Sequence, residues 1–202
     1  MASPDPRRFA PAVARNRDPL LDAIRRHLPA TGLVLEVASG SGEHAVHFAA
    51  ALQDLDFQPS DPEAAARASI DAWVAASGLA NIRPALALDA AAAAWPVAAA
   101  DAVVCINMIH IAPWAAAEGL VRGAASILPP GGPLILYGPY RRGGAHTAPS
   151  NAAFDADLRA RDPAWGVRDL ESVAAIAAAQ GFGPASVTEM PANNLTVVFR
   201  RL

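Results

Sequence analysis

Short apolar segments alternate with longer helical segments along most of the chain, and this alternation constrains the fold more than any other feature. Five apolar stretches have the composition of strands, and helical segments lie between most of them. Two further strands close the chain and are joined by the short connection Pro191-Ala192-Asn193-Asn194, which indicates a hairpin. The seven predicted strands are 33–37, 55–60, 82–88, 101–107, 133–137, 182–190 and 195–200. Strands and helices in this order predict an α/β fold, a largely parallel sheet with helices on both faces.

The length of 202 residues predicts one main domain. Residues 1–17 are polar and rich in arginine, so we expect an N-terminal arm or lid there. The pair Asp18-Pro19 has the form of a helix cap followed by proline, which places the start of the first helix and of a single domain over residues 18–202. The stretch 138–149 is predicted to be a long functional loop.

Composition excludes several classes of protein. All 16 basic residues are arginine, and the absence of lysine excludes P-loop NTPases, Schiff-base enzymes and Tyr/Lys dehydrogenases. A net charge of −3 provides no basic surface for nucleic acid. The single cysteine, Cys105, lies in an apolar run and is expected to be a buried, inert thiol. Polar residues and prolines interrupt the most apolar region, and the N-terminal segment has no apolar signal core, so we expect a cytoplasmic protein without a membrane partner.

The end of the first predicted strand carries the strongest functional signal. Glu36 is followed by Ala38 and by two glycines, Gly40 and Gly42, which permit positive φ and a close approach of a ligand to the backbone. Dinucleotide-binding enzymes and methyltransferases both use such a loop. A carboxylate at position 36 would repel a pyrophosphate but could pair with the α-ammonium of S-adenosylmethionine. The alternative is a structural carboxylate that accepts hydrogen bonds from loop amides.

Polar side chains also end the next three strands, where ligands bind in such sheets. Asp61 lies 21 residues after Gly40 and could accept hydrogen bonds from a ribose diol, or it could simply cap the helix that follows. Asp89 could accept a hydrogen bond from an adenine amine, and a plain turn residue is the alternative. Asn107 offers an amide to cofactor or acceptor. Arg17 could pair with the carboxylate of a methionine moiety, although a solvated basic segment explains it equally well.

These residues resemble the class I S-adenosylmethionine-dependent methyltransferases. Several segments are similar, more closely, to the methyltransferase-like 26 family: 34–47, 58–61, 105–114, 137–140 and 189–194. The resemblance covers roughly residues 15–201. It implies a Rossmann-like, doubly wound, seven-stranded sheet in the order 3-2-1-4-5-7-6 with strand 7 antiparallel, and S-adenosyl-L-methionine as the cofactor. Ala38 departs from the pattern, because the class often has glycine there.

Methyl transfer to a hydroxyl or amine also requires removal of a proton. The catalytic candidates are His110, after the fourth strand, and Tyr137, Tyr140 and His146, after the fifth, of which His146 is favoured because it lies in the predicted loop; a structural role for His110 is the alternative. His44 and His47 lack an evident third ligand, so no metal is expected. The leading hypothesis is therefore a metal-independent methyltransferase that acts on a small molecule. An NAD(P)-binding oxidoreductase and a non-catalytic cofactor-binding protein are the alternatives, and the oligomeric state is open.

Overall fold

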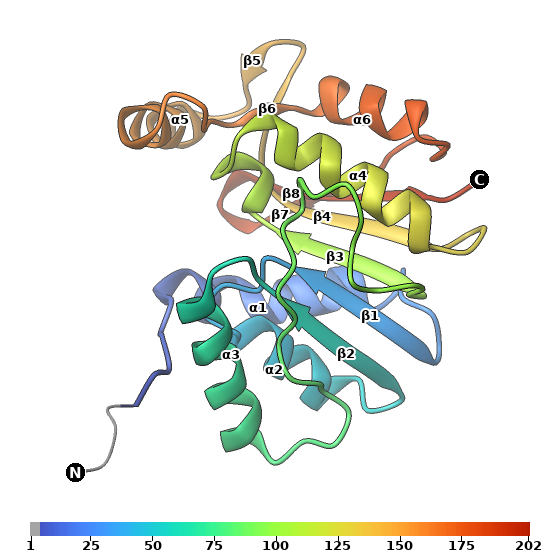
Figure 1. The fold of residues 1–202 in the computed structure, drawn as a ribbon. Coiled ribbons are helices and arrows are strands. Elements are labelled where there is room, and N and C mark those ends of the chain that lie inside the picture. The colour runs from blue at the N-terminus through green and yellow to red at the C-terminus, as the bar shows by residue number, and fades with distance from the viewer. Residues whose placement is uncertain (1–4) are drawn as a thin grey trace.

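The computed structural model describes residues 5–202, and its centre is a mixed β-sheet (Figure 1). The main strands lie in the order β2-β1-β3-β4-β8-β7, and the short strands β5 and β6 pair with β4. Strands β1 to β4 are parallel, whereas β8 is antiparallel to β4 and to β7. The strand bounds are β1 Gly32–Val37, β2 Leu55–Ser60, β3 Ala102–Ile106, β4 Pro133–Arg142, β5 Ala145–His146, β6 Arg168–Asp169, β7 Ser186–Met190 and β8 Asn194–Arg200.

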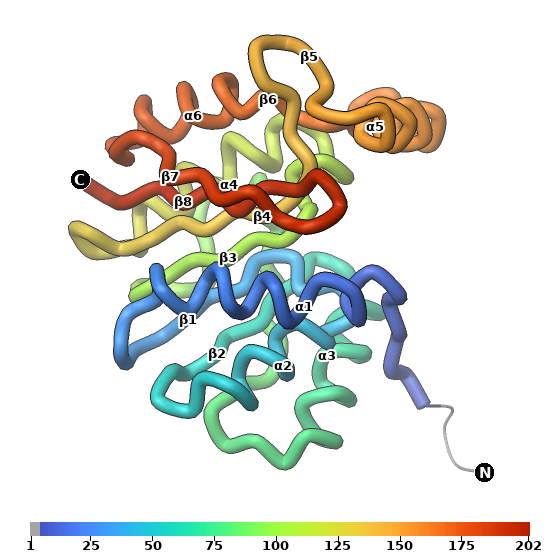
Figure 2. The backbone as a smooth tube through the Cα atoms, turned by 180° about the vertical axis from the view of Figure 1, so that it is seen from behind, coloured from blue at the N-terminus to red at the C-terminus, as the bar shows by residue number. Residues whose placement is uncertain are grey.

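Helices cover both faces of the sheet. Helices α4 and α6 pack on one face, and α1 and α2 pack on the other, with α3 beside α2 (Figures 1 and 2). Helix α5 lies outside these layers (Figure 1). The helix bounds are α1 Pro11–Ile24, α2 Glu43–Ala51, α3 Ala64–Ser77, α4 Trp114–Ile127, α5 Pro149–Arg161 and α6 Leu170–Ala179, with the 3₁₀ turns η1 Met108–His110 and η2 Pro191–Asn193.

Each face has its own apolar core because successive strand residues point to opposite sides. On β1, Leu35 and Val37 join the core under α4 and α6, while Val34 joins the core under α1 and α2. Glu36 has the parity of Val34, so its side chain belongs to the α1/α2 face. Buried strands of this kind read as continuous apolar runs, which is why they were visible in the sequence.

The predicted fold class is confirmed, and the strand order agrees broadly with the prediction. The segment expected as the third strand, 82–88, makes only two isolated bridges to β2, Phe57 with Ile82 and Ser60 with Leu86. Pro84 lies between these bridges and has no N–H to donate, which interrupts a regular ladder. With the two short strands β5 and β6, the sheet has eight strands instead of seven.

The predicted start of the first helix was wrong. Helix α1 begins at Pro11, and Pro19 lies inside it. Proline there removes one helical hydrogen bond, but Leu20, Leu21 and Ile24 are buried against the sheet, and this packing offsets the loss. The arm predicted for residues 1–17 is thus helical from Pro11 onward, and residues 1–4 lie outside the described residues.

The prediction of a long loop at 138–149 was also wrong for most of these residues. Strand β4 continues to Arg142 and turns back through Gly143-Gly144 into β5, so His146 lies in a paired strand opposite Arg141. Glycines at positive φ make this tight turn, and their presence led to the loop prediction. Among the helices of residues 5–202, none combines the length and apolarity that crossing a membrane requires.

Candidate functional site

The loop between β1 and α2 has three residues at positive φ. Ala38, Gly40 and Gly42 have φ values of 59°, 61° and 93°. A Cβ at Gly42 would lie 2.8 Å from the Cα of Ile70, so this glycine lets α2 pack closely on α3. A Cβ at Gly40 would meet no described atom within 4 Å. Glycine at position 40 therefore faces open space that a ligand can enter.

Glu36 is a buried carboxylate with an unused oxygen directly beneath this loop. The residue is 3% exposed, and its Oε2 has no hydrogen-bond partner among residues 5–202. Burial raises the pKa of Glu36 to about 7; the nearby charge of Asp61 acts in the same direction, and Ser39 opposes it. Leaving a buried charged acceptor unpaired is costly in a folded protein. Such a group marks a place where a hydrogen-bond donor or a cation is missing.

Asp61 fastens the glycine loop to the end of β2. Its Oδ2 accepts a hydrogen bond from the N–H of Gly40 at 3.1 Å, and its Oδ1 accepts one from the N–H of Glu63 at 2.9 Å. Burial raises the pKa of Asp61 although both amides oppose this. Both roles considered for Asp61 remain compatible with this geometry, because each carboxylate oxygen can accept a second hydrogen bond.

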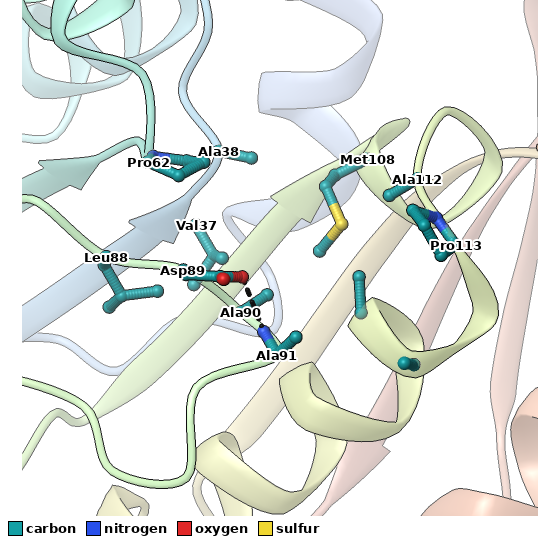
Figure 3. Close-up of a pocket in the computed structure, with 12 residues that line it drawn as sticks. Val37, Ala38, Pro62, Leu88, Asp89, Ala90, Ala91, Met108, Ala112 and Pro113 are labelled. Carbon is teal, nitrogen blue, oxygen red and sulfur yellow. Dashed lines mark hydrogen bonds between the residues drawn. The ribbon is translucent and has the colours of Figure 1, made fainter.

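An apolar cavity of about 280 Å³ opens beside the loop, on the α4 side of β1 (Figure 3). Figure 3 shows Pro62, Leu88 and Asp89 on one side of it and Met108 and Pro113 on the other. Asp89 is exposed, and its Oδ1 accepts a hydrogen bond from the N–H of Ala91 at 2.9 Å. The cavity thus pairs apolar walls with one carboxylate, an arrangement that suits a flat heterocycle bearing an amino group.

A second, larger cavity of about 580 Å³ lies past the carboxyl end of β3 and beside the middle of β4. Asn107, at φ 62°, lines this cavity, while its neighbour Met108 lines the first one. Adjacent residues at the end of β3 therefore line the two cavities. The remaining lining residues of the larger cavity come from α1, β4, α5 and η2: Ala12, Asn16, Ile111, Tyr137, Pro139, Ser150, Asn151, Phe154, Ala192, Asn193 and Asn194.

Helix α1 brings Asn16, but not Arg17, to this cavity. The Oδ1 of Asn16 lies 2.9 Å from Nε2 of His44. Burial lowers the pKa of His44 to about 4, and the charges of His47 and Arg17 lower it further. The lowered pKa favours a neutral imidazole, and the tautomer with its proton on Nε2 can donate to Asn16. Arg17 is exposed and, like Glu36, Gly40 and Asp61, is not a lining residue of either cavity, so its pairing with a methionine carboxylate stays a prediction.

Of the four catalytic candidates, His110, Tyr140 and His146 line neither cavity, whereas Tyr137 lines the larger one. His110 and Tyr140 are 0% exposed, and their rings contact each other edge to face at 5.0 Å. Burial lowers the pKa of His110 to about 3 and raises that of Tyr140 far above its usual range. Neither side chain can reach an acceptor in this conformation, so the structural alternative fits His110. His146 lies 3.5 Å from Asp155, which also binds Arg159 and the N–H of Val167.

The predicted buried thiol agrees with the structure. Cys105 is 2% exposed, and burial raises the pKa of its thiol far above the usual range. Within residues 5–202, no group of three or more His, Cys, Asp and Glu side chains is arranged to hold a metal ion.

Residues 7–201 match the model of a protein family described as protein of unknown function DUF938. The chain belongs to the DUF938 family. The match spans nearly the whole DUF938 chain, including both cavities and the glycine loop.

Solved structures show that this DUF938 chain has the class I methyltransferase fold. The S-adenosylmethionine-dependent methyltransferase SibL is 21% identical, with a TM-score of 0.77. The match covers 94% of the DUF938 chain and 55% of SibL. Human N-acetylserotonin methyltransferase, solved with SAM, is 13% identical, with a TM-score of 0.79. The match covers 94% of the DUF938 chain and 52% of the human protein. The DUF938 chain spans about half the length of these proteins. YcgJ from Bacillus subtilis is 13% identical with a TM-score of 0.70, and 99% of it is covered.

The sequence predictions missed the far wall of the larger cavity. Ser150, Asn151 and Phe154 of α5 and Asn193 of η2 line it, and none of them was expected at a site. The pair Asn193-Asn194 was visible as a polar turn, but nothing in the sequence indicates that α5 packs against that turn.

Proposed function

We propose that the protein is an S-adenosylmethionine-dependent methyltransferase that acts on a small-molecule acceptor. The single observation that carries this proposal is the unpaired, buried Oε2 of Glu36 beneath a loop with open space at Gly40. An α-ammonium group would supply the missing partner for this oxygen, directly or through water. A pyrophosphate would bring further negative charge to a carboxylate, so a dinucleotide fits the same site poorly.

The neighbouring residues fit the rest of this cofactor. Glu36 would hold the ammonium group, and Gly40 and Gly42 would allow close approach of the methionine part. Asp61 would accept hydrogen bonds from the ribose, and the 280 Å³ cavity with Asp89 at its rim would take the adenine. When bound, the sulfonium supplies an electrophilic methyl group.

The chain's own contribution to the reaction is positioning. Asn107 and Met108 separate the two cavities and would place an acceptor in the larger cavity next to the methyl group, which gives the reaction its proximity advantage. None of the described residues that line the larger cavity is a carboxylate or a histidine, and burial raises the pKa of the lining phenol Tyr137, so it stays protonated. We therefore assign no general base among them, and the proton of a hydroxyl acceptor would leave to water.

Isothermal titration with S-adenosylhomocysteine tests the cofactor assignment. We expect measurable binding to the wild type, and Glu36→Gln should weaken it by more than about tenfold, or about 1.4 kcal/mol. Glu171→Gln, at an exposed position in the first turn of α6, is the matched control and should leave the affinity unchanged. Absence of binding at about 1 mM, or tighter binding of NADH, would refute the proposal.

The finer sequence predictions stay proposals. Membership of the methyltransferase-like 26 family rests on the five segments named above. A cytoplasmic location and a small-molecule partner, without nucleic acid or membrane, rest on composition alone. A transfer assay with labelled cofactor and a metabolite extract would separate an active enzyme from a non-catalytic cofactor-binding protein, because only the former passes on the label.

A further inference from the structure

The larger cavity has an unusual chemical character. Five of its twelve lining residues are asparagines, and the described lining carries no Asp, Glu, His or Arg. Its lining includes Ile111 and Phe154, which are 41% and 39% exposed. They are among the few large apolar side chains that are exposed to solvent in the described residues. An apolar wall combined with fixed amides is the usual design of a small-molecule site.

Each amide nitrogen on the far wall already donates at least one hydrogen bond within the protein. Nδ2 of Asn151 donates to Oγ1 of Thr147 at 3.0 Å and to the carbonyl of Asn193 at 2.9 Å. Nδ2 of Asn193 donates to Oγ of Ser150 at 3.1 Å, and Nδ2 of Asn194 donates to the carbonyl of Pro191 at 3.2 Å. Because these bonds fix the amide orientation, the Oδ1 atoms of three lining asparagines are the groups left to accept hydrogen bonds.

We propose that this cavity binds an uncharged aromatic ring that carries hydroxyl donors, and that such a phenol is the methyl acceptor. The three carbonyl oxygens recognise O–H groups, and Phe154 and Ile111 contact the ring. An anionic acceptor would find no cation among the described lining residues. A phenol also suits a site without a base, because its proton is far more acidic than that of an alcohol.

The acceptor part of this inference rests on the proposed methyltransferase function. In the transfer, the phenol oxygen bonds to the methyl carbon while the carbon–sulfur bond of the donor breaks. The sulfur keeps the bonding pair, and the phenol proton passes to water. The binding part of the inference does not depend on transfer and is tested separately.

Three small probes separate the contributions to binding. Catechol is neutral and has two donors, 1,2-dimethoxybenzene has the same ring without donors, and 3,4-dihydroxybenzoate adds a carboxylate. In saturation-transfer NMR, catechol should bind with a Kd of up to about 10 mM. The other two probes should bind with affinities at least about tenfold lower. Equal binding of either analogue, or no binding of catechol, would overturn the proposal.

Two variants locate the site. Phe154→Ala removes a partly exposed wall and should weaken catechol binding by about fivefold or more, while S-adenosylhomocysteine binding stays within about twofold. Phe9→Ala is the control, because Phe9 is 67% exposed and packs on Trp73, away from the cavity lining. Equal effects of the two variants would contradict the location.

The cofactor titration distinguishes the two proposals. If catechol binds as expected but S-adenosylhomocysteine does not, the cavity assignment stands and the methyltransferase function fails. If the cofactor binds and catechol is not preferred, the function stands and the phenol acceptor is rejected.

Discussion

At the scale of single residues, Glu36 combines a functional advantage with a cost in stability. Its side chain is 3% exposed, and its Oε2 has no partner among the described residues, so the ionised form is disfavoured in the fold. The pKa rises from 4.5 to about 7. A group whose folded pKa lies above its unfolded pKa stabilises the fold at low pH and loses that contribution as the pH rises through the folded pKa.

Glu36→Gln should therefore stabilise the protein above about pH 7, by roughly 2 to 3 kcal/mol. Near pH 4.5, where the wild-type carboxyl is protonated in the fold, the difference should vanish. Urea unfolding at both pH values measures this. A variant that is less stable than the wild type at pH 8 would show that Glu36 is satisfied by the protein itself, as the structural alternative requires.

Ala38 carries backbone strain that glycine would relieve. Its φ of 59° is in the left-handed region, where a side chain costs about 1 kcal/mol. Ala38→Gly should raise the free energy of unfolding by up to that amount, measured by urea denaturation. Ala45→Gly, at a buried position in helix α2, should lower it by about 1 kcal/mol, since glycine weakens a helix interior. Destabilisation by Ala38→Gly would mean that the methyl group's packing outweighs the strain.

At the scale of elements, the β1–α2 loop holds one glycine needed for packing, Gly42, and one that faces open space, Gly40. Gly40 and Gly78 share positive φ values of 61° and 66°, and a Cβ at either would meet no described atom within 4 Å. Gly78 ends helix α3, away from both cavities. The two positions therefore form a matched pair for substitution.

Gly40→Ala and Gly78→Ala should each destabilise the protein by about 1 kcal/mol, because both force alanine into the left-handed region. Only Gly40→Ala should weaken S-adenosylhomocysteine binding, by about tenfold or more. Thermal unfolding and calorimetric titration of both variants provide the two measurements. An unchanged affinity for Gly40→Ala would mean that the open space at the loop is not where the cofactor lies.

At the scale of the whole molecule, buried histidines make the fold sensitive to acid. Burial lowers the pKa of His44 to about 4 and that of His110 to about 3, from 6.5. Both stay neutral in the fold, whereas the unfolded chain binds their protons below pH 6.5, so the free energy of unfolding falls as the pH drops from there. Glu36 acts in the opposite direction between pH 7 and pH 4.5.

Wild type should therefore lose stability between about pH 7 and pH 4, and Glu36→Gln should lose about twice as much, since the opposing contribution is removed. Urea unfolding across this range, with both proteins in the same buffers, gives the two slopes. Parallel slopes would show that Glu36 titrates normally in the fold.

Much of this architecture was predictable because it depends on local pattern. Apolar runs identified β1, β3 and β4, and the residues ending them lie at one edge because parallel strands align their carboxyl ends. The strand at 82–88 and the loop at 138–149 were mispredicted, since bridging and hairpin extension depend on which neighbours are available. The start of α1 was mispredicted because tertiary packing of Leu20 and Ile24 overrides a proline within the helix.

The sequence by itself determined the fold class and placed Glu36, Asp61 and Asp89 in or after segments of strand character, because strand periodicity and the spacing of acids and glycines are local properties. Only the tertiary structure decided which side chains face space. It buried His110 and Tyr140 out of reach, and it brought α5 against η2 to form an asparagine-lined cavity. Burial and the pairing of distant helices depend on how the two faces of the sheet are covered, and no local pattern encodes that.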